Sequence, residues 1–519
     1  MNIQSTAPEK SGPITLGGIA PFAIGAVMIQ PSRLTLIGPA GEVSAEPRVM
    51  QVLIALSEAG GDTVTRENLM ERCWSGMTVG DDSLNRAIGE LRRVMREAGA
   101  DWTVDTVPRI GYRINNSSDD TAPVLPAARL NLDRRRVLAG SAALTLAAAA
   151  GIVWIATGRP RRNAEVETLI AEGRQALREQ LPYRNRNALV ALGEAASKAP
   201  EDAEVLGLLA IAWRDEAEFA SAADASAAAR NCEAAARRAL AIDAAEPNAL
   251  AALATLQPFY GDWIEAERRI LNVLEAAPES IPALSVLTTL YQSSGYLGES
   301  RKRNDQALKL DPLSPVFQFR AALKHWIDGD LSAADLQIDR TIELWPRHPA
   351  VWNARLMLFA YTGRAAAGLQ FLNNAEMHPT NLPKPALALW SAVLSALSGD
   401  RNARGDARPV ATAAALAGVP GVPTAIMYLS YAGQLDAAFD VANGFFLRRG
   451  PLAASGQAQP KVSWVTDQSW RRSMMLFTPA TESMRNDPRF EDLARGMGLA
   501  NFWKERGKGP DFRTVDARR

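Results

Sequence analysis

Glycine recurs with a fixed spacing of 34 residues in the second half of this chain, and this period restricts the folds open to it. Positions with this spacing are Gly261, Gly295, Gly329 and Gly363, together with Pro278, Pro312 and Pro346. Such a period is typical of stacked helix pairs, in which each unit is a helix, a turn, a second helix and a terminator. The second helices are predicted at Trp263–Ala276, Leu297–Leu310 and Leu331–Trp345. The chain is therefore predicted to be mostly α, with a C-terminal α-solenoid over 161–480.

A single unit of this kind cannot bury its own apolar face, so neighbouring units must stack into a continuous core with a concave surface. Surfaces of this kind commonly bind peptides or partner proteins, and we expect a protein or peptide partner at the repeats. A purely structural role for any individual residue is the alternative, so the sequence assigns no single ligand contact.

The repeat pattern resembles the tetratricopeptide repeat over about 187–445. The residues that match its turn glycine, its small packing residues, its closing proline and its first helix are Gly261, Ala266, Val273, Pro278, Leu284, Leu287 and Tyr291. The segment 481–519 is expected to cap the last repeat with its apolar residues, which are Phe490, Leu493, Leu499 and Trp503.

An uncharged apolar stretch precedes the repeats. Residues 137–157 carry no charge and are flanked by arginines at 134–136 and at 159, 161 and 162. A helix of that length spans the ~30 Å hydrocarbon core of a bilayer, so the sequence predicts one transmembrane helix over 134–160, with a buried alanine-rich helix as the alternative. Small residues every four positions along it, from Ala139 to Gly151, are compatible with a homodimer.

The N-terminal region predicts a small domain of strands and helices at 22–115, after a disordered N-terminus at 1–21. Strands are expected at Phe22–Ile29 and Leu34–Ile37, and Pro47 opens a first helix. A second helix follows with Thr65 as its N-cap. A flexible linker is expected at 116–133, where Asn, Ser, Asp and Pro are frequent.

The third helix of this domain begins near Asp81 and is amphipathic. Its apolar stripe and its polar, arginine-bearing face lie on opposite sides. Two strands around Val107-Pro108-Arg109 follow it and form a hairpin. The apolar stripe consists of Leu84, Ile88, Leu91 and Met95, and the polar face carries Asn85, Arg86, Arg92, Arg93 and Arg96.

This pattern resembles the OmpR/PhoB-type winged helix, and within it the membrane-bound ToxR/CadC-like branch. The residues that carry the resemblance are 85–93 on the third helix and 106–113 in the hairpin. The resemblance implies that the third helix enters the major groove of promoter DNA while the wing touches the adjacent minor groove. The candidate DNA contacts are Ser83, Asn85, Arg86, Arg92, Arg93, Arg109 and Arg113.

Guanidinium groups bind phosphates and guanine edges in a bidentate manner, which is why arginines on one exposed face favour DNA. Asn85, Arg86 and Arg93 are expected at base edges, and Arg92 and Arg113 at the DNA backbone. Residues 22–114 hold 10 basic and 12 acidic side chains, so the alternative is a merely solvated face.

Several classes of function are not expected. Basic and acidic residues balance at 57 each, so any attraction to nucleic acid must be local. Cys73 and Cys232 give no disulfide framework, and the three histidines have no metal spacing. Neither catalytic residues nor a cofactor or metal is expected. The residues before the first strand are too few for a receiver domain.

The sequence thus predicts a winged helix (α+β), one transmembrane helix and a tetratricopeptide-like solenoid. The function expected from it is a membrane-embedded one-component transcriptional regulator in the inner membrane, with a cytoplasmic N-terminus and a periplasmic repeat domain. Double-stranded promoter DNA and the lipid bilayer are the expected partners. The alternatives are a membrane-anchored tetratricopeptide interaction scaffold and a wholly cytoplasmic repeat-containing transcription factor.

Overall fold

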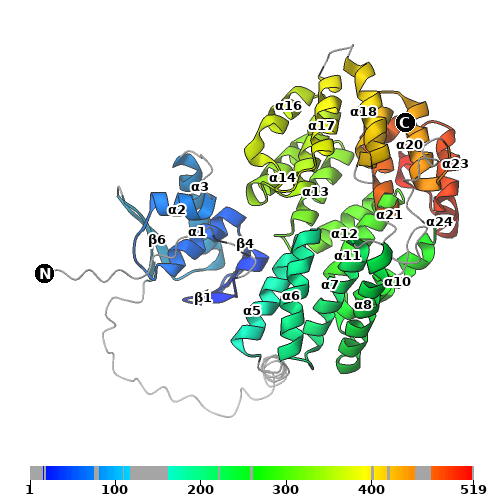
Figure 1. Cartoon of the computed structure of the whole chain (residues 1–519). Helices are drawn as coiled ribbons and strands as arrows, with labels where there is room; N and C mark the ends of the chain where they lie inside the picture. The colour runs from blue at the N-terminus through cyan, green and yellow to red at the C-terminus, as the bar shows by residue number, and fades with distance from the viewer. Residues whose placement is uncertain are drawn as a thin grey trace, which may run out of the picture. The chain divides into compact units, whose positions relative to one another are not determined.

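The computed structural model describes residues 14, 16, 19–74, 81–108, 110–116, 162–219, 222–256, 261–398, 403–417, 421–450 and 469–516. The chain divides into two compact units, Met1–Ala171 and Glu172–Arg519 (Figure 1). Among the described residues, the first unit holds the strands and three complete α-helices, and the second is built of helices.

The first unit begins with a four-stranded antiparallel sheet in the order β1-β2-β3-β4. The predicted strand at Phe22–Ile29 is two strands, because Gly25 adopts a φ of 55° and closes a hairpin there. Residues 38–41 form the turn between the last two strands, since Gly38 pairs with Gly41. The strands are β1 (Phe22–Ile24), β2 (Val27–Gln30), β3 (Thr35–Gly38) and β4 (Gly41–Ser44).

Three helices and a second sheet complete this unit. Pro47 opens the first helix and the Thr65 hydroxyl accepts the backbone N–H of Asn68 at 3.1 Å, so both predicted helix starts are confirmed. The second sheet has the order β5-β7-β6. These elements are α1 (Pro47–Glu58), α2 (Arg66–Trp74), α3 (Asp81–Ala98), β5 (Val64–Thr65), β6 (Trp102–Val107) and β7 (Gly111–Asn116).

The core of the first unit reaches further towards the N-terminus than the expected start at residue 22. Ile14 and Leu16 are buried, and the Gln51 side-chain amide donates to the carbonyl of Ile14 at 2.8 Å. The predicted wing residue Arg109 and residues 117–161, which include the expected linker, lie outside the described part of the chain.

The second unit is a stack of antiparallel helix pairs. Two of the predicted second helices have the bounds expected of them, Trp263–Ala276 and Leu297–Leu310, and the third ends one residue early at Leu344. The helices are α5 (Ala164–Arg178), α6 (Pro182–Lys198), α7 (Ala203–Phe219), α8 (Ala222–Ile242), α9 (Pro247–Leu256), α10 (Trp263–Ala276), α11 (Ile281–Ser293), α12 (Leu297–Leu310), α13 (Pro315–Ile327), α14 (Leu331–Leu344), α15 (Pro349–Tyr361), α16 (Ala365–Asn373), α17 (Lys384–Leu397), α18 (Ala403–Ala417), α19 (Val422–Tyr431) and α20 (Leu435–Ala442).

The periodic glycines occupy the turns between the two helices of a pair. Their φ values are 90° at Gly261, 86° at Gly295, 84° at Gly329 and 76° at Gly363. Residues with a side chain rarely adopt this left-handed conformation, so each turn requires glycine. The repeat period, and its likeness to the tetratricopeptide repeat, therefore has a direct structural cause.

The last part of the chain does more than cover the final repeat. Phe490, Leu493, Leu499 and Trp503 are buried, and Arg489 pairs with Asp436 of α20 at 2.8 Å. The same segment also returns to the middle of the stack, because Asp511 donates its backbone N–H to the Gly295 carbonyl at 2.9 Å. Its helices are α21 (Ser469–Arg472), α22 (Glu482–Arg485), α23 (Arg489–Gly496), α24 (Leu499–Glu505) and α25 (Asp511–Asp516). We call residues 469–516 the C-terminal segment.

The predicted fold class and location need one correction, which concerns the membrane. Among the described helices, none is both long enough and apolar enough to cross a bilayer. Those with at least 18 residues are α3 and α8, and each carries several charged side chains. The expected helix at 134–160, with its small-residue stripe, lies outside the described residues. The transmembrane helix and the single-pass inner-membrane location with a periplasmic repeat domain are therefore withdrawn.

Both cysteines, Cys73 and Cys232, are fully buried. Burial raises the pKa of each thiol to about 12. Such thiols stay protonated at neutral pH and act as small apolar side chains.

Candidate nucleic-acid interface

The outward face of α3 follows from how this helix is packed. Leu84, Ile88 and Leu91 are buried, with exposures of 0%, 2% and 0%. Because these residues lie on one side of the helix, the polar residues between them point to solvent. Asn85, Arg86, Arg93 and Arg96 are exposed, as the amphipathic pattern predicted.

Arg86 and Arg96 are the least restrained cations on this face. Within the described part of the chain, neither guanidinium has a hydrogen-bond or ion-pair partner. An unpaired guanidinium keeps all five donors for an incoming phosphate or guanine edge.

Arg93 is held by two neighbours on its own helix. Its guanidinium pairs with Glu90 at 2.5 Å and with Glu97 at 2.6 Å, which lie one turn before and one turn after it. The hydrogen bond from Arg93 lowers the pKa of the Glu90 carboxyl. These pairs are solvent-exposed and therefore weak, but they orient Arg93 along the helix rather than away from it.

Asn85 belongs to a small network that joins three elements. Its side-chain oxygen accepts from the Tyr112 hydroxyl at 3.0 Å and from Arg66 at 3.1 Å. Arg66 also donates to the Tyr112 hydroxyl oxygen at 2.7 Å. The network fixes the rotamer of Asn85 and directs its amide nitrogen away from β7. Arg66 was not predicted as part of this site, because 19 residues separate it from Asn85 and nothing local in the sequence joins them.

Arg92 joins α3 to the wing. Its Nε and Nη2 donate to the carbonyl of Val104 at 3.0 and 2.8 Å, and Nη2 also reaches the Thr106 hydroxyl at 2.9 Å. Since Val104 and Thr106 lie on β6, these three hydrogen bonds from Arg92 set the position of the hairpin against the helix.

The remaining predicted contacts flank this centre. Ser83 is half-buried in the first turn of α3, and exposed Arg113 on β7 lies 3.9 Å from the Asp105 carboxylate. Arg109 lies outside the described residues. Gly111 begins β7, where a Cβ would lie 1.9 Å from the Val64 carbonyl, so only glycine allows β5 and β7 to pair here.

Comparison with known proteins identifies this domain. The family model for the C-terminal domain of transcriptional regulatory proteins matches residues 40–114. The transcriptional regulator HilA of Salmonella typhimurium is 32% identical over 85 residues, which cover 16% of this chain and 15% of HilA. The transcriptional activator CadC of Escherichia coli is 25% identical over 93 residues, 18% of each chain. The chain therefore spans less than a fifth of the curated relatives it matches.

Among solved structures, the chain is similar to yeast Tom70, with a TM-score of 0.32 and 13% identity over 65% of this chain and 69% of that chain. A likeness at this level carries no further inference. The family and the relatives that match the first unit are named as regulators of transcription and not as enzymes. Residues 40–114 are therefore an OmpR/PhoB-type winged-helix DNA-binding domain of the kind found in transcriptional regulators.

Proposed function

We propose that the whole chain is a one-component transcriptional regulator, in which the winged helix binds promoter DNA and the helical repeats receive the input. The observation that carries this proposal is a pair of exposed guanidinium groups on the outward face of α3, Arg86 and Arg96, which have no hydrogen-bond or ion-pair partner among the described residues. The proposal corresponds to the repeat-containing transcription factor, since it needs no step across a membrane.

In this proposal α3 lies in the major groove, with Arg86 directed to a base edge and Arg96 to a phosphate. Asn85 offers its amide nitrogen to a base acceptor, since its oxygen is occupied by Arg66 and Tyr112. Ser83 and Arg113 contact the DNA backbone on either side. Arg92 holds the wing in place rather than contacting DNA itself, because its Nε and Nη2 donate to Val104 and Thr106 of β6 and fix the guanidinium there.

Arg93 has a conditional role. A DNA phosphate or base must compete with Glu90 and Glu97 for its guanidinium. The two carboxylates also repel DNA phosphates, which reduces sequence-independent binding. Specific contacts through Arg86 then decide where the protein binds.

The test is binding of the full chain to DNA from its own upstream region, measured at several salt concentrations. Replacement of Arg86 by Ala should cost about 1–3 kcal/mol of binding free energy on the best site, as loss of a bidentate base contact does. The matched control is Arg33→Ala, an exposed arginine of the turn between β2 and β3, which should change little. Equal affinity of wild type and Arg86→Ala on every DNA tested would remove the basis of the proposal.

A further inference from the structure

A cavity of about 250 Å³ lies within the second unit, where the first helices of successive pairs converge. Its walls come from α5, α7, α9, α11 and α13, and from Arg471 of the C-terminal segment. One side is apolar, with Leu208, Ile211, Ile281 and Val286. Ligand sites for small molecules combine such an apolar wall with a few fixed polar groups, and this volume suits a molecule smaller than a typical drug.

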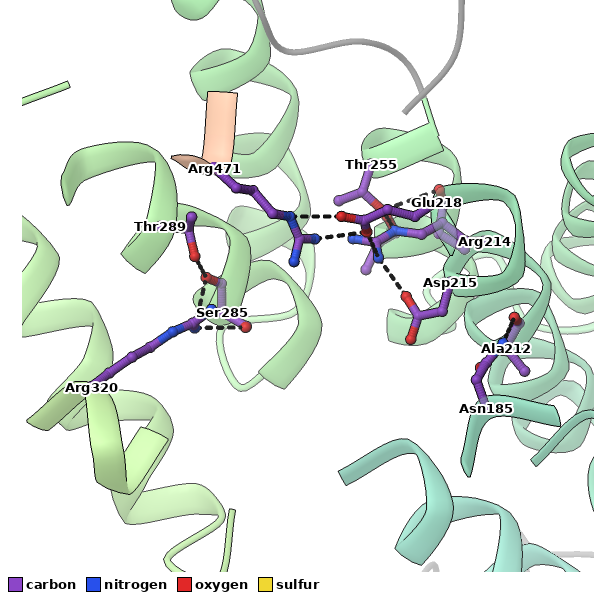
Figure 2. Close-up of polar contacts among 12 residues, drawn as sticks. Asn185, Ala212, Arg214, Asp215, Glu218, Thr255, Ser285, Thr289, Arg320 and Arg471 are labelled. Carbon is purple, nitrogen blue, oxygen red and sulfur yellow. Dashed lines mark hydrogen bonds and ion pairs between the residues drawn. The ribbon is translucent and has the colours of Figure 1, made fainter. Parts of the chain in front are cut away.

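One polar wall of the cavity is already neutral. Arg214 pairs with Asp215 and, at 2.8 Å, with Glu218, while Arg471 reaches Glu218 at 2.7 Å from the C-terminal segment (Figure 2). The Glu218 side chain is only 1% exposed, so water cannot replace these partners. Two cations and two carboxylates balance here, and no charge remains for a ligand.

Arg320 differs from this wall. It is 8% exposed, and its Nη1 donates to the hydroxyl and carbonyl of Ser285, at 3.0 and 3.4 Å, where Ser285 lines the cavity (Figure 2). Its Nε is buried without a hydrogen-bond partner, and within the described residues no carboxylate pairs with it. A buried cation without a counter-charge is costly to the folded protein. Burial and the neighbouring charge of Arg471 lower the pKa of Arg320 to about 9.

The hydroxyl of Ser285 adds a donor beside this cation. Its oxygen accepts from Arg320, which leaves the hydroxyl hydrogen for an acceptor in the cavity. Thr289 is not such a donor, since its hydroxyl donates to the Ser285 carbonyl at 3.2 Å. The cavity thus has an apolar wall and, on Ser285, one hydroxyl donor, and the Arg320 cation contacts Ser285 without itself lining the cavity.

We propose that this cavity binds a small amphipathic monocarboxylate, whose carboxylate accepts from the Ser285 hydroxyl beside the buried Arg320 cation and whose alkyl part covers Ile281 and Val286. A carboxylate there places beside Arg320 the counter-charge that it lacks among the described residues. A single negative charge suffices because the cations that line the cavity are paired with carboxylates; these cations are Arg174, Arg178, Arg214 and Arg471. This inference rests on the proposed function and extends it, because it names the class of molecule that the repeats sense.

The experiment uses the full chain and hexanoate as the probe, with titration calorimetry and thermal unfolding as readouts. Hexanoate should bind saturably at one site and raise Tm. Hexan-1-ol, which lacks the charge, and inorganic phosphate, which lacks the alkyl chain, should each bind at least about tenfold more weakly. Equal stabilisation by hexanoate and hexan-1-ol, or no saturable hexanoate binding, would overturn the proposal.

The decisive variant is Arg320→Gln, which should weaken hexanoate binding by about tenfold or more. Its matched control is Lys324→Gln on the same helix, a buried cation whose partners Gln292 and Ser300 do not line the cavity, whereas the Arg320 partner Ser285 does. That control should bind hexanoate as the wild type does. If Arg320→Gln does not fold, Ser285→Ala provides the second variant and should also weaken binding. Unchanged affinity in a folded Arg320→Gln protein, or equal weakening by both glutamine variants, refutes the site.

Promoter binding is measured on the same protein samples, so the two proposals can fail separately. Loss of hexanoate binding with intact DNA binding overturns only the cavity assignment. Absence of DNA binding with intact hexanoate binding overturns the regulator and leaves the site.

Discussion

Trp263 of α10 donates its indole N–H to the backbone carbonyl of Met497 at 2.8 Å, although 234 residues separate the two in the chain. Trp503 makes the equivalent contact in the opposite direction, from α24 to the carbonyl of Ser294 at 2.8 Å. Each indole is almost fully buried. The C-terminal segment is therefore an integral part of the repeat core, joined to α10 and to the end of α11 through reciprocal hydrogen bonds.

The first prediction concerns this pair of contacts. Trp263→Phe keeps an aromatic ring but leaves the Met497 carbonyl buried without its donor, which should lower the free energy of unfolding by about 1–3 kcal/mol. Trp352→Phe is the matched control, because the buried indole nitrogen of Trp352 has no hydrogen-bond partner among the described residues. Urea unfolding followed by circular dichroism measures both. If the control loses as much stability as Trp263→Phe, the hydrogen bond is not the cause.

The second prediction compares two glycines of the winged helix. A Cβ at Gly111 would lie 1.9 Å from the backbone carbonyl of Val64, whereas one at Gly89 meets nothing within 4 Å. Gly111→Ala should therefore separate β5 from β7. It should lower the free energy of unfolding by about 3 kcal/mol or more, as other severe backbone conflicts do. Gly89→Ala should stabilise the protein by about 0.5–1 kcal/mol, because alanine favours the helix. A fully stable Gly111→Ala protein would contradict the close approach of these strands.

The sequence was most informative where a local rule decided the structure. The glycine period predicted the helix pairs because the left-handed turns at Gly261 and Gly295 tolerate almost nothing else. The apolar stripe from Leu84 to Met95 predicted the buried face of α3, because which residues share a face of a helix depends only on helical periodicity.

Long-range side-chain pairing carried no such signal. The contact of Arg66 with Asn85 and the return of Trp503 to Ser294 join residues that no periodicity relates. The ion pairs of Arg93 with Glu90 and Glu97 have the three- and four-residue spacing of neighbours on a helix, so the sequence could have predicted them. Arg93 was instead predicted as a DNA contact from its positive charge alone.

The third prediction separates the two roles open to Arg92. Lysine can replace arginine as a point charge at a phosphate, but it cannot reproduce the donors that reach Val104 and Thr106. If Arg92 positions the wing, Arg92→Lys should weaken promoter binding by about 1–2 kcal/mol. Titration of the full chain against promoter DNA over a range of salt concentrations measures this.

The salt dependence supplies the control for this third prediction. Arg96→Ala, which removes a proposed phosphate contact, should reduce the slope of log K against log salt by about 0.9. Arg92→Lys should leave that slope unchanged. Wild-type affinity in Arg92→Lys would instead assign Arg92 to the DNA backbone, as the sequence pattern first indicated.

The fourth prediction follows from Lys324, a fully buried cation on α13. Its ammonium group donates to Gln292 Oε1 at 3.0 Å and to Ser300 Oγ at 2.8 Å, without a carboxylate in hydrogen-bond contact within the described residues. Burial first, and then the charges of Arg320 and Arg301, lower the pKa of Lys324 from 10.5 to about 7. Between those two values the unfolded chain binds one more proton at this site than the folded chain does.

The stability contributed by this residue must therefore rise with pH across that window. Below about pH 7 both states are charged and the full cost of the buried cation is present, whereas above about pH 10 both are neutral. Lys324→Met should thus stabilise the protein at about pH 6, within the 1–4 kcal/mol range seen when buried charges are replaced by apolar residues. The gain should shrink steadily towards about pH 10. Urea unfolding of both proteins across this range measures the difference, and a gain that is independent of pH would mean that Lys324 stays charged in the folded protein.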